Sequence, residues 1–184
     1  MPERSPGILW VGVASERLRS RLASRLGAVV SGEELRELMR RFPAGVAIVG
    51  VDLDGERLGL TIGTLIPLSL EPPLVGFAVR REAALHELLR RSGSFGFSLL
   101  ATGQEAVAQH FARGVPPIAL WEGIDVRDVD GPPLLEGAIG WLTGRVSAEV
   151  PAGEDTFFVG EVLSVEEGLR SRPLVYVDRG YVTA

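Results

Sequence analysis

Turn-forming residues divide this chain of 184 residues into many short apolar segments. Its 23 Gly and 12 Pro are spread along the chain, and both residue types interrupt regular structure. The segments between them are rich in β-branched and aromatic residues, as in GVAIVGV (45–51) and SFGFSLL (94–100). Such segments, linked by hairpin turns and a few short helices, predict a mainly β protein. We expect a Greek-key-like, closed antiparallel barrel rather than a βαβ sheet.

Local signals place most of these elements. Asp54-Gly55 is a strong hairpin turn between strands at 45–51 and 57–64. Pro67 and the pair Pro72-Pro73 are expected to break the chain before the next strand. The remaining expected elements are a strand LVGFAV, helices at 83–90 and 104–111, a strand at 94–100, a loop at 113–133, a strand at 138–150, a turn at Gly153, a strand FFVGEVLSV and a final strand RPLVYV.

The first thirty residues are expected to form a separate strand–helix extension. ILWVGV is typical of a strand, and Ser15 could cap a helix that ends near Gly27. A second helix is predicted after residue 30, because Ser31 and Glu34 have the spacing of a capping box. We therefore expect an extension at 1–30 and one main domain at 31–184.

Composition excludes several kinds of chemistry. The chain has no Cys and two His, which excludes disulfides and thiol nucleophiles and argues against a metal site. Its net charge of -5 argues against a nucleic-acid partner. No apolar run is long enough for a transmembrane helix, and the N-terminus does not have the pattern of a signal peptide. We expect a cytoplasmic protein without a membrane or metal partner.

Five collinear stretches carry a resemblance to a known family. They are RRFPAGVAIV, LGLTIGTLIPLSLEPPLVGFAV, LLRRSGSFGFSLLATGQEAVAQHFA, GPPLLEGAIGWLTGRVSAEVPAGEDTFFVGEVLSV and RPLVYVDRGY, which span roughly residues 36–181. Their order resembles the flavin reductase-like family of FMN-binding split barrels, and SLEPPLV is the best single match. The resemblance implies a split β-barrel fold, with FMN or FAD as cofactor and NAD(P)H as co-substrate.

The resemblance also implies where the flavin lies. In the family the segment before SLEPPLV wraps the isoalloxazine ring and is rich in Ser and Thr. Here Ile66 and Pro67 replace a Thr and a Ser, and Pro67 removes an amide donor. The usable positions of this segment are Gly59, Thr61, Gly63, Thr64 and Ser69. Apolar side chains in the segment could pack on the ring faces.

Other candidate residues follow from the same resemblance. Arg80 and Arg81 stand where the family contacts the flavin phosphate, or they form a solvated pair at a helix start. His86 could face that phosphate or pack within its helix, and Phe111 matches a family R-F-A motif. Asp155 replaces a family His on the nicotinamide side, away from the phosphate, or is an exposed turn acid. Arg179 and Tyr181 approximate a family R-G-x-Y motif that could reach the coenzyme or cap the last strand.

The resemblance therefore implies an NAD(P)H-dependent flavin reductase, in which the flavin accepts a hydride and no protein nucleophile is needed. Its reduced flavin could serve a monooxygenase component. Two alternatives stay open: a flavin-binding module without reductase activity, such as an electron carrier or store, and a barrel that acts only in assembly. We also expect a homodimer, because split barrels of this kind usually build the flavin cleft at a two-fold interface.

Overall fold

The computed structural model describes residues 30–113 and 119–183. The expected strand and helix within the first thirty residues lie outside this range. The chain divides into two compact units, Met1–Met39 and Arg40–Ala184. In the first unit, α2 (Gly32–Met39) begins with the expected capping box. The Ser31 N–H donates to Glu34 Oε2 at 2.8 Å, and the Glu34 N–H donates to Ser31 Oγ at 3.2 Å.

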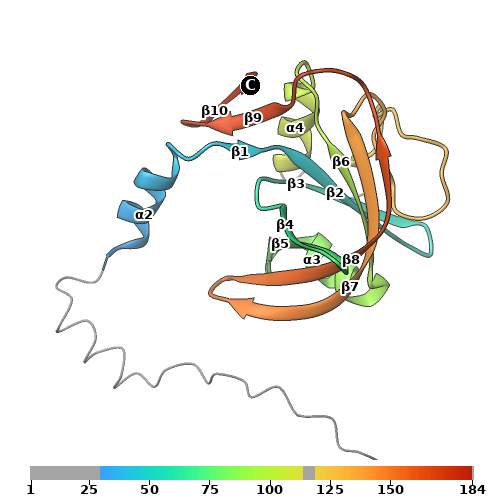
Figure 1. The fold of residues 1–184 in the computed structure, drawn as a ribbon, viewed down its shortest axis with the longest axis horizontal. Helices are drawn as coiled ribbons and strands as arrows, with labels where there is room; N and C mark the ends of the chain where they lie inside the picture. Colours follow the sequence, from blue (N-terminus) through green and yellow to red (C-terminus); the bar gives the residue numbers. More distant parts are fainter. Residues whose placement is uncertain (1–29, 114–118, 184) are drawn as a thin grey trace, which may run out of the picture. The chain divides into compact units, whose positions relative to one another are not determined.

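The second unit is built on one seven-stranded antiparallel sheet (Figure 1). Its strand order is β3-β2-β6-β7-β8-β5-β4. The strands are β2 (Ala47–Leu53), β3 (Glu56–Ile62), β4 (Ile66–Leu70), β5 (Pro73–Arg80), β6 (Ser94–Leu99), β7 (Gly140–Ala152) and β8 (Asp155–Glu167). The expected mainly β fold with short helices is confirmed. The expected closure is wrong, because among the described residues β3 and β4 each pair with one strand and form open edges.

A smaller sheet completes the unit. It joins β1 (Ala44–Gly45), β9 (Leu174–Val177) and β10 (Gly180–Thr183) in the order β1-β9-β10. Backbone hydrogen bonds connect it to the large sheet: the Val46 N–H donates to the Leu174 carbonyl at 3.1 Å, and the Leu174 N–H donates to the Leu100 carbonyl at 2.9 Å. These bonds hold the hairpin of β9 and β10 next to the start of β2.

Two elements were absent from the sequence prediction. Strand β4 contains Pro67, which was expected to break the chain. Because β4 is an edge strand, a residue without an N–H is tolerated there, and Pro67 still pairs with Val75 of β5. Strand β10 follows a turn in which Asp178 and Arg179 adopt φ values of 49° and 65°. No glycine marks those two turn positions, so the usual signal of a tight hairpin was missing.

The core lies between the curved sheet and two short helices. Four phenylalanines are fully buried at its centre, and the ring of Phe77 lies 5.0–5.6 Å from the rings of Phe95, Phe97 and Phe158. Helix α3 (Ala84–Ser92) packs against β2 and β5, and α4 (Glu105–Ala112) packs against β3 (Figure 1). No helix among the described residues has the length and apolar character needed to cross a membrane.

Candidate functional site

The end of β5 and the start of α3 form a corner that is rich in hydrogen-bond donors. Arg80 is the last residue of β5, Arg81 follows it, and both are exposed. Helix α3 begins after Ala83, and no described side chain caps its N-terminus. The first amides of a helix point outward and carry a partial positive charge. Two guanidinium groups and an uncapped helix start therefore lie within a few residues of each other, which suits an oxyanion such as a phosphate.

The β7–β8 turn, Gly153 and Glu154, contacts this corner. Asp155 is the register partner of Arg80 between β8 and β5. The Arg80 guanidinium lies 3.3 Å from Glu154 Oε2. The Arg81 N–H donates to the Glu154 carbonyl at 3.2 Å, and the Arg81 guanidinium donates to the Gly153 carbonyl. The sequence interpretation separated Asp155 from the two arginines. The long-range pairing of β5 with β8 instead brings these residues together.

His86 lies inside this corner. It is buried in the first turn of α3, and its Nε2 is 2.8 Å from Oγ1 of Thr156, which is also buried. The imidazole ring meets the ring of Phe158 edge to face at 5.6 Å. This hydrogen bond connects α3 to β8 at the residue after Asp155, which is the register partner of Arg80. In the structure His86 packs within the protein, as one of its two sequence interpretations had it.

The segment that joins β3 to β4 runs beside the corner. Thr64 Oγ1 accepts the Ala78 N–H at 3.1 Å and lies 3.2 Å from the Ala78 carbonyl. Ala78 is two residues from Arg80 along β5, a distance of about 7 Å. After Thr64 the side chains of Ile66 and Leu68 are exposed, and Ser69 is half-buried. Thr64 is therefore held near the arginine end of β5, whereas Ser69 lies opposite Leu74, toward the other end of that strand.

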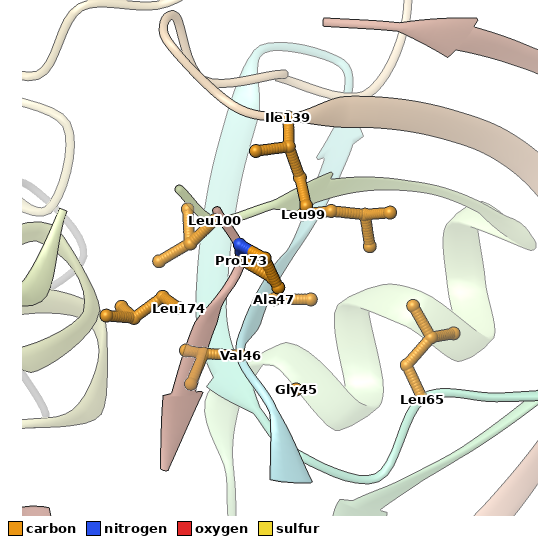
Figure 2. Close-up of a pocket in the computed structure, with 9 residues that line it drawn as sticks. All are labelled: Gly45, Val46, Ala47, Leu65, Leu99, Leu100, Ile139, Pro173 and Leu174. Atoms are coloured by element: carbon orange, nitrogen blue, oxygen red, sulfur yellow. The ribbon is translucent and has the colours of Figure 1, made fainter. Parts of the chain in front are cut away.

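An apolar pocket opens next to this segment (Figure 2). Its volume is about 170 Å³, and every lining side chain is a hydrocarbon. Leu65 approaches it from the β3–β4 segment, opposite Val46 and Ala47 from the start of β2 (Figure 2). The full lining is Gly45, Val46, Ala47, Leu65, Leu99, Leu100, Ile139, Pro173 and Leu174. This surface can pack against a flat apolar ring, but its side chains cannot donate a hydrogen bond to one.

Three of the expected residues gather in a second pocket. Thr61, Gly63 and Tyr181 line a cavity of about 250 Å³ together with Tyr176. Thr61 Oγ1 donates to the Ala108 carbonyl at 2.7 Å, which ties β3 to α4. The rings of Tyr181 and Tyr176 meet edge to face at 5.2 Å. Burial, and then the neighbouring Tyr176, raise the pKa of Tyr181 above its ordinary value, so its phenol stays protonated at neutral pH.

The other expected residues lie apart from both groups. Phe111 is 2% exposed and belongs to the core. A Cβ placed on Gly59 would stand 2.6 Å from the Phe111 ring and 2.9 Å from Trp121, so Gly59 is covered by these two rings. Arg179 is exposed in the β9–β10 turn. The sequence analysis assigned no role to Glu154, which precedes Asp155 in the stretch Gly153-Glu154-Asp155-Thr156.

Comparison with known proteins decides the family. Residues 39–184 match the model of the flavin reductase like domain. The chain belongs to the flavin reductase-like family. It is 42% identical, over 150 residues, to the reductase component of 4-hydroxyphenylacetate 3-monooxygenase from Thermus thermophilus, covering 81% of this chain and 94% of that protein. An NADH-dependent FAD reductase from Streptomyces globisporus is 34% identical over 135 residues, covering 71% of this chain and 74% of that protein.

Solved structures of this flavin reductase-like family have the same fold. The NADH:FAD oxidoreductase SgcE6 from Streptomyces globisporus C-1027 superimposes with a TM-score of 0.78 at 28% identity, over 86% of this chain and 98% of its own. That protein is also known in complex with NAD and FAD fragments. Flavin reductase HpaC, complexed with NADP⁺, gives a TM-score of 0.77 at 29% identity, over 84% of this chain and 98% of its own.

Proposed function

We propose that this protein is an NAD(P)H-dependent flavin reductase that supplies reduced FMN or FAD to a monooxygenase component. Its family membership and the names of its relatives support this proposal. The structural observation that carries it is the corner of Arg80 and Arg81, which begins two residues along β5 from Ala78, the residue that is hydrogen-bonded to Thr64. Thr64 thus links the proposed phosphate donors to Leu65, the next residue, which lines the apolar pocket.

The residues present fit a flavin nucleotide. Arg80, Arg81 and the uncapped start of α3 offer charge-assisted donors to the phosphate. Leu65 and the exposed side chains of Ile66 and Leu68 offer apolar contact to the ring system. Backbone amides near Thr64 are available for the polar edge of the ring, although Pro67 contributes none. A bound flavin would supply the hydride-accepting chemistry itself.

The protein's own residues act by binding and orientation. The two hydrogen bonds between Thr64 and Ala78 hold the β3–β4 segment in place, so the apolar strip is fixed before a ligand arrives. The hydrocarbon lining near Leu65 keeps water from the ring side of the cleft. Asp155 stands where the family has a His, and its carboxylate would repel an anionic nicotinamide dinucleotide that approached this corner.

We propose further that the protein acts as a homodimer in the cytoplasm. A second copy would add a wall to a cleft that is open on the side of β4, where Ile66, Leu68 and Leu70 are exposed. A two-fold interface needs only one self-complementary patch. NADH and NADPH are intracellular coenzymes, and a protein that uses them needs access to an intracellular pool. Light scattering tests the first proposal, since a mass of one chain at micromolar concentration would contradict it; cell fractionation tests the second.

One observation favours a second candidate, a flavin-binding protein without its own reductase activity. Asp155 brings a negative charge to the place where the family has an imidazole, and Arg80 already has Glu154 as an anionic neighbour. The Asp155 charge opposes an anionic coenzyme, whereas the flavin ring would still have its apolar contacts. Such a protein would bind flavin normally but would exchange electrons with NADH or NADPH only slowly.

The phosphate corner is tested by replacing both arginines. We expect R80A/R81A to weaken FMN binding about tenfold, since charge-assisted contacts contribute about 1.5–3 kcal/mol each and exposure reduces this. Riboflavin, which lacks the phosphate, should bind the variant as it binds the wild type. The matched control is R170A/R172A, which removes two exposed arginines from the loop before β9. Equal weakening of FMN and riboflavin in a fluorescence titration would show that the phosphate is bound elsewhere.

A further inference from the structure

The β7–β8 turn brings a carboxylate to the guanidinium group that the proposed phosphate would use. Arg80 lies 3.3 Å from Glu154 Oε2, and both side chains are largely exposed, at 59% and 80%. Arg81 is engaged differently, because its partners are the backbone carbonyls of Gly153 and Glu154. A substitution of Glu154 therefore removes the carboxylate next to Arg80. The backbone carbonyls that accept hydrogen bonds from Arg81 are still present.

Acidic residues near the two arginines compete with a phosphate for these positive charges. Three acidic residues lie at this corner: Glu154, whose carboxylate contacts Arg80, Asp155, the register partner of Arg80, and Glu82, which follows Arg81 in the chain. A phosphomonoester carries a charge of about -1.5 to -2 at neutral pH. It would attract Arg80 more strongly than the single charge of Glu154 does, but the Glu154 carboxylate must first move away. Its exposed side chain is free to rotate into water, so the exchange needs no change in the backbone.

We propose that Glu154 is a specificity-determining residue, which lowers the affinity for flavins that carry a terminal phosphate by competing for Arg80. The inference rests on the proposed flavin-binding function. A flavin without a phosphate, such as riboflavin, does not displace Glu154 and is indifferent to it. The contact between Glu154 and Arg80 therefore makes the difference in affinity between FMN and riboflavin smaller than the two arginines alone would make it. It therefore tunes how tightly the protein holds FMN and how readily it releases it.

The size of the effect follows from the exposure of the pair. Exposed ion pairs are weak, and salt screens them. Removing the Glu154 charge should strengthen FMN binding about two- to fivefold at low ionic strength. The gain should shrink as salt is added, and the Kd of riboflavin should stay the same.

The experiment compares E154Q, E82Q and wild type in FMN and riboflavin titrations. E82Q is the matched control, because it removes one charge from the same corner, beside Arg81 rather than opposite Arg80. We expect E154Q to gain more FMN affinity than E82Q, and neither to change riboflavin binding. In an R80A background E154Q should give no gain, since the competing contact is already absent. The double-mutant cycle of E154Q and R80A measures the coupling energy between these two side chains in FMN binding.

Two results would overturn the inference. One is an E154Q protein whose FMN affinity equals that of wild type or of E82Q, and the other is an equal gain in the R80A background. Failure of the underlying phosphate site is visible separately. It would appear as an R80A/R81A protein that loses FMN and riboflavin affinity equally, whatever E154Q does.

Discussion

Arg127 shows how a single side chain fastens the long loop of residues 119–137 to the sheet. Its guanidinium donates two hydrogen bonds to the Glu166 carboxylate, at 2.8 and 2.9 Å, and lies 4.0 Å from the centroid of the Trp141 ring. Trp141 in turn donates to the Leu135 carbonyl at 2.8 Å. Only arginine combines a planar fork with stacking on an aromatic face. The loop is thus held at one point by charge, stacking and a backbone contact.

The Arg127–Glu166 pair predicts a pH dependence of stability. Hydrogen bonds from Arg127 hold the pKa of Glu166 below its ordinary value of 4.5. A carboxyl with a lowered folded-state pKa stabilises the fold above its unfolded pKa, and this stabilisation is lost as the pH falls through the folded pKa. We expect E166Q to have a lower Tm than wild type at pH 7, and the difference to shrink as the pH falls below the unfolded value of about 4.3 and through the lower folded pKa. Thermal unfolding followed across pH measures this.

R127K provides the matched comparison for this pair. It keeps the positive charge but loses the two-pronged contact and the stacking on Trp141. Its Tm should also fall at pH 7. Part of this loss should remain in acid, because the stacking on Trp141 does not depend on the charge of Glu166. A constant difference between E166Q and wild type from pH 7 down to pH 3 would contradict the assigned role of Glu166.

At the scale of elements, glycine marks where two elements approach most closely. On β3, Gly59 lies under the rings of Phe111 from α4 and Trp121 from the following loop. A methyl group there would stand 2.6 Å from the Phe111 ring, closer than packed atoms allow. Phe111 is buried in the core, so its ring cannot swing into solvent to make room. The contact between β3 and α4 therefore requires glycine at this position.

We expect G59A to destabilise the protein by about 1–3 kcal/mol, the usual range for an overpacked core site. G45A is the control, because a Cβ on Gly45 would have no neighbour within 4 Å and this residue also lies in a strand. Urea unfolding gives both free energies. A G59A protein as stable as G45A would mean that Gly59 is free to face a ligand, as the sequence interpretation had it.

Local patterns explain which elements the sequence could predict. The Asp54-Gly55 turn and the Ser31–Glu34 capping box depend on neighbouring residues, and both are present. The presence of β4 depended on Pro67 being at a sheet edge, and edge position is a property of the whole sheet. The proximity of Asp155 to Arg80 depends on the register between β5 and β8, about 75 residues apart. Short motifs carry no information on such pairings, so the site could be predicted only in part.

At the scale of the molecule, the large sheet has an open edge at β4. The edge at β4 leaves the β3–β4 segment and the arginine corner accessible, and the family match covers these elements in residues 39–184. Of the residues expected from resemblance, Thr64, Arg80, Arg81 and Asp155 lie near this corner, and Ser69 lies further away, opposite Leu74. Thr61, Gly63 and Tyr181 form a separate pocket beside the small sheet. In the proposed function, the flavin would bind along this exposed region.

The most direct test of the proposed function is anaerobic mixing of the wild-type protein with FMN and NADH or NADPH. The visible absorption band of the flavin and the absorbance of the nicotinamide are followed together. We predict that one equivalent of coenzyme is consumed for each flavin bleached, in catalytic turnover with one or both coenzymes. A protein that binds FMN with normal affinity but leaves its visible band unchanged with either coenzyme would contradict the reductase function and support a flavin carrier.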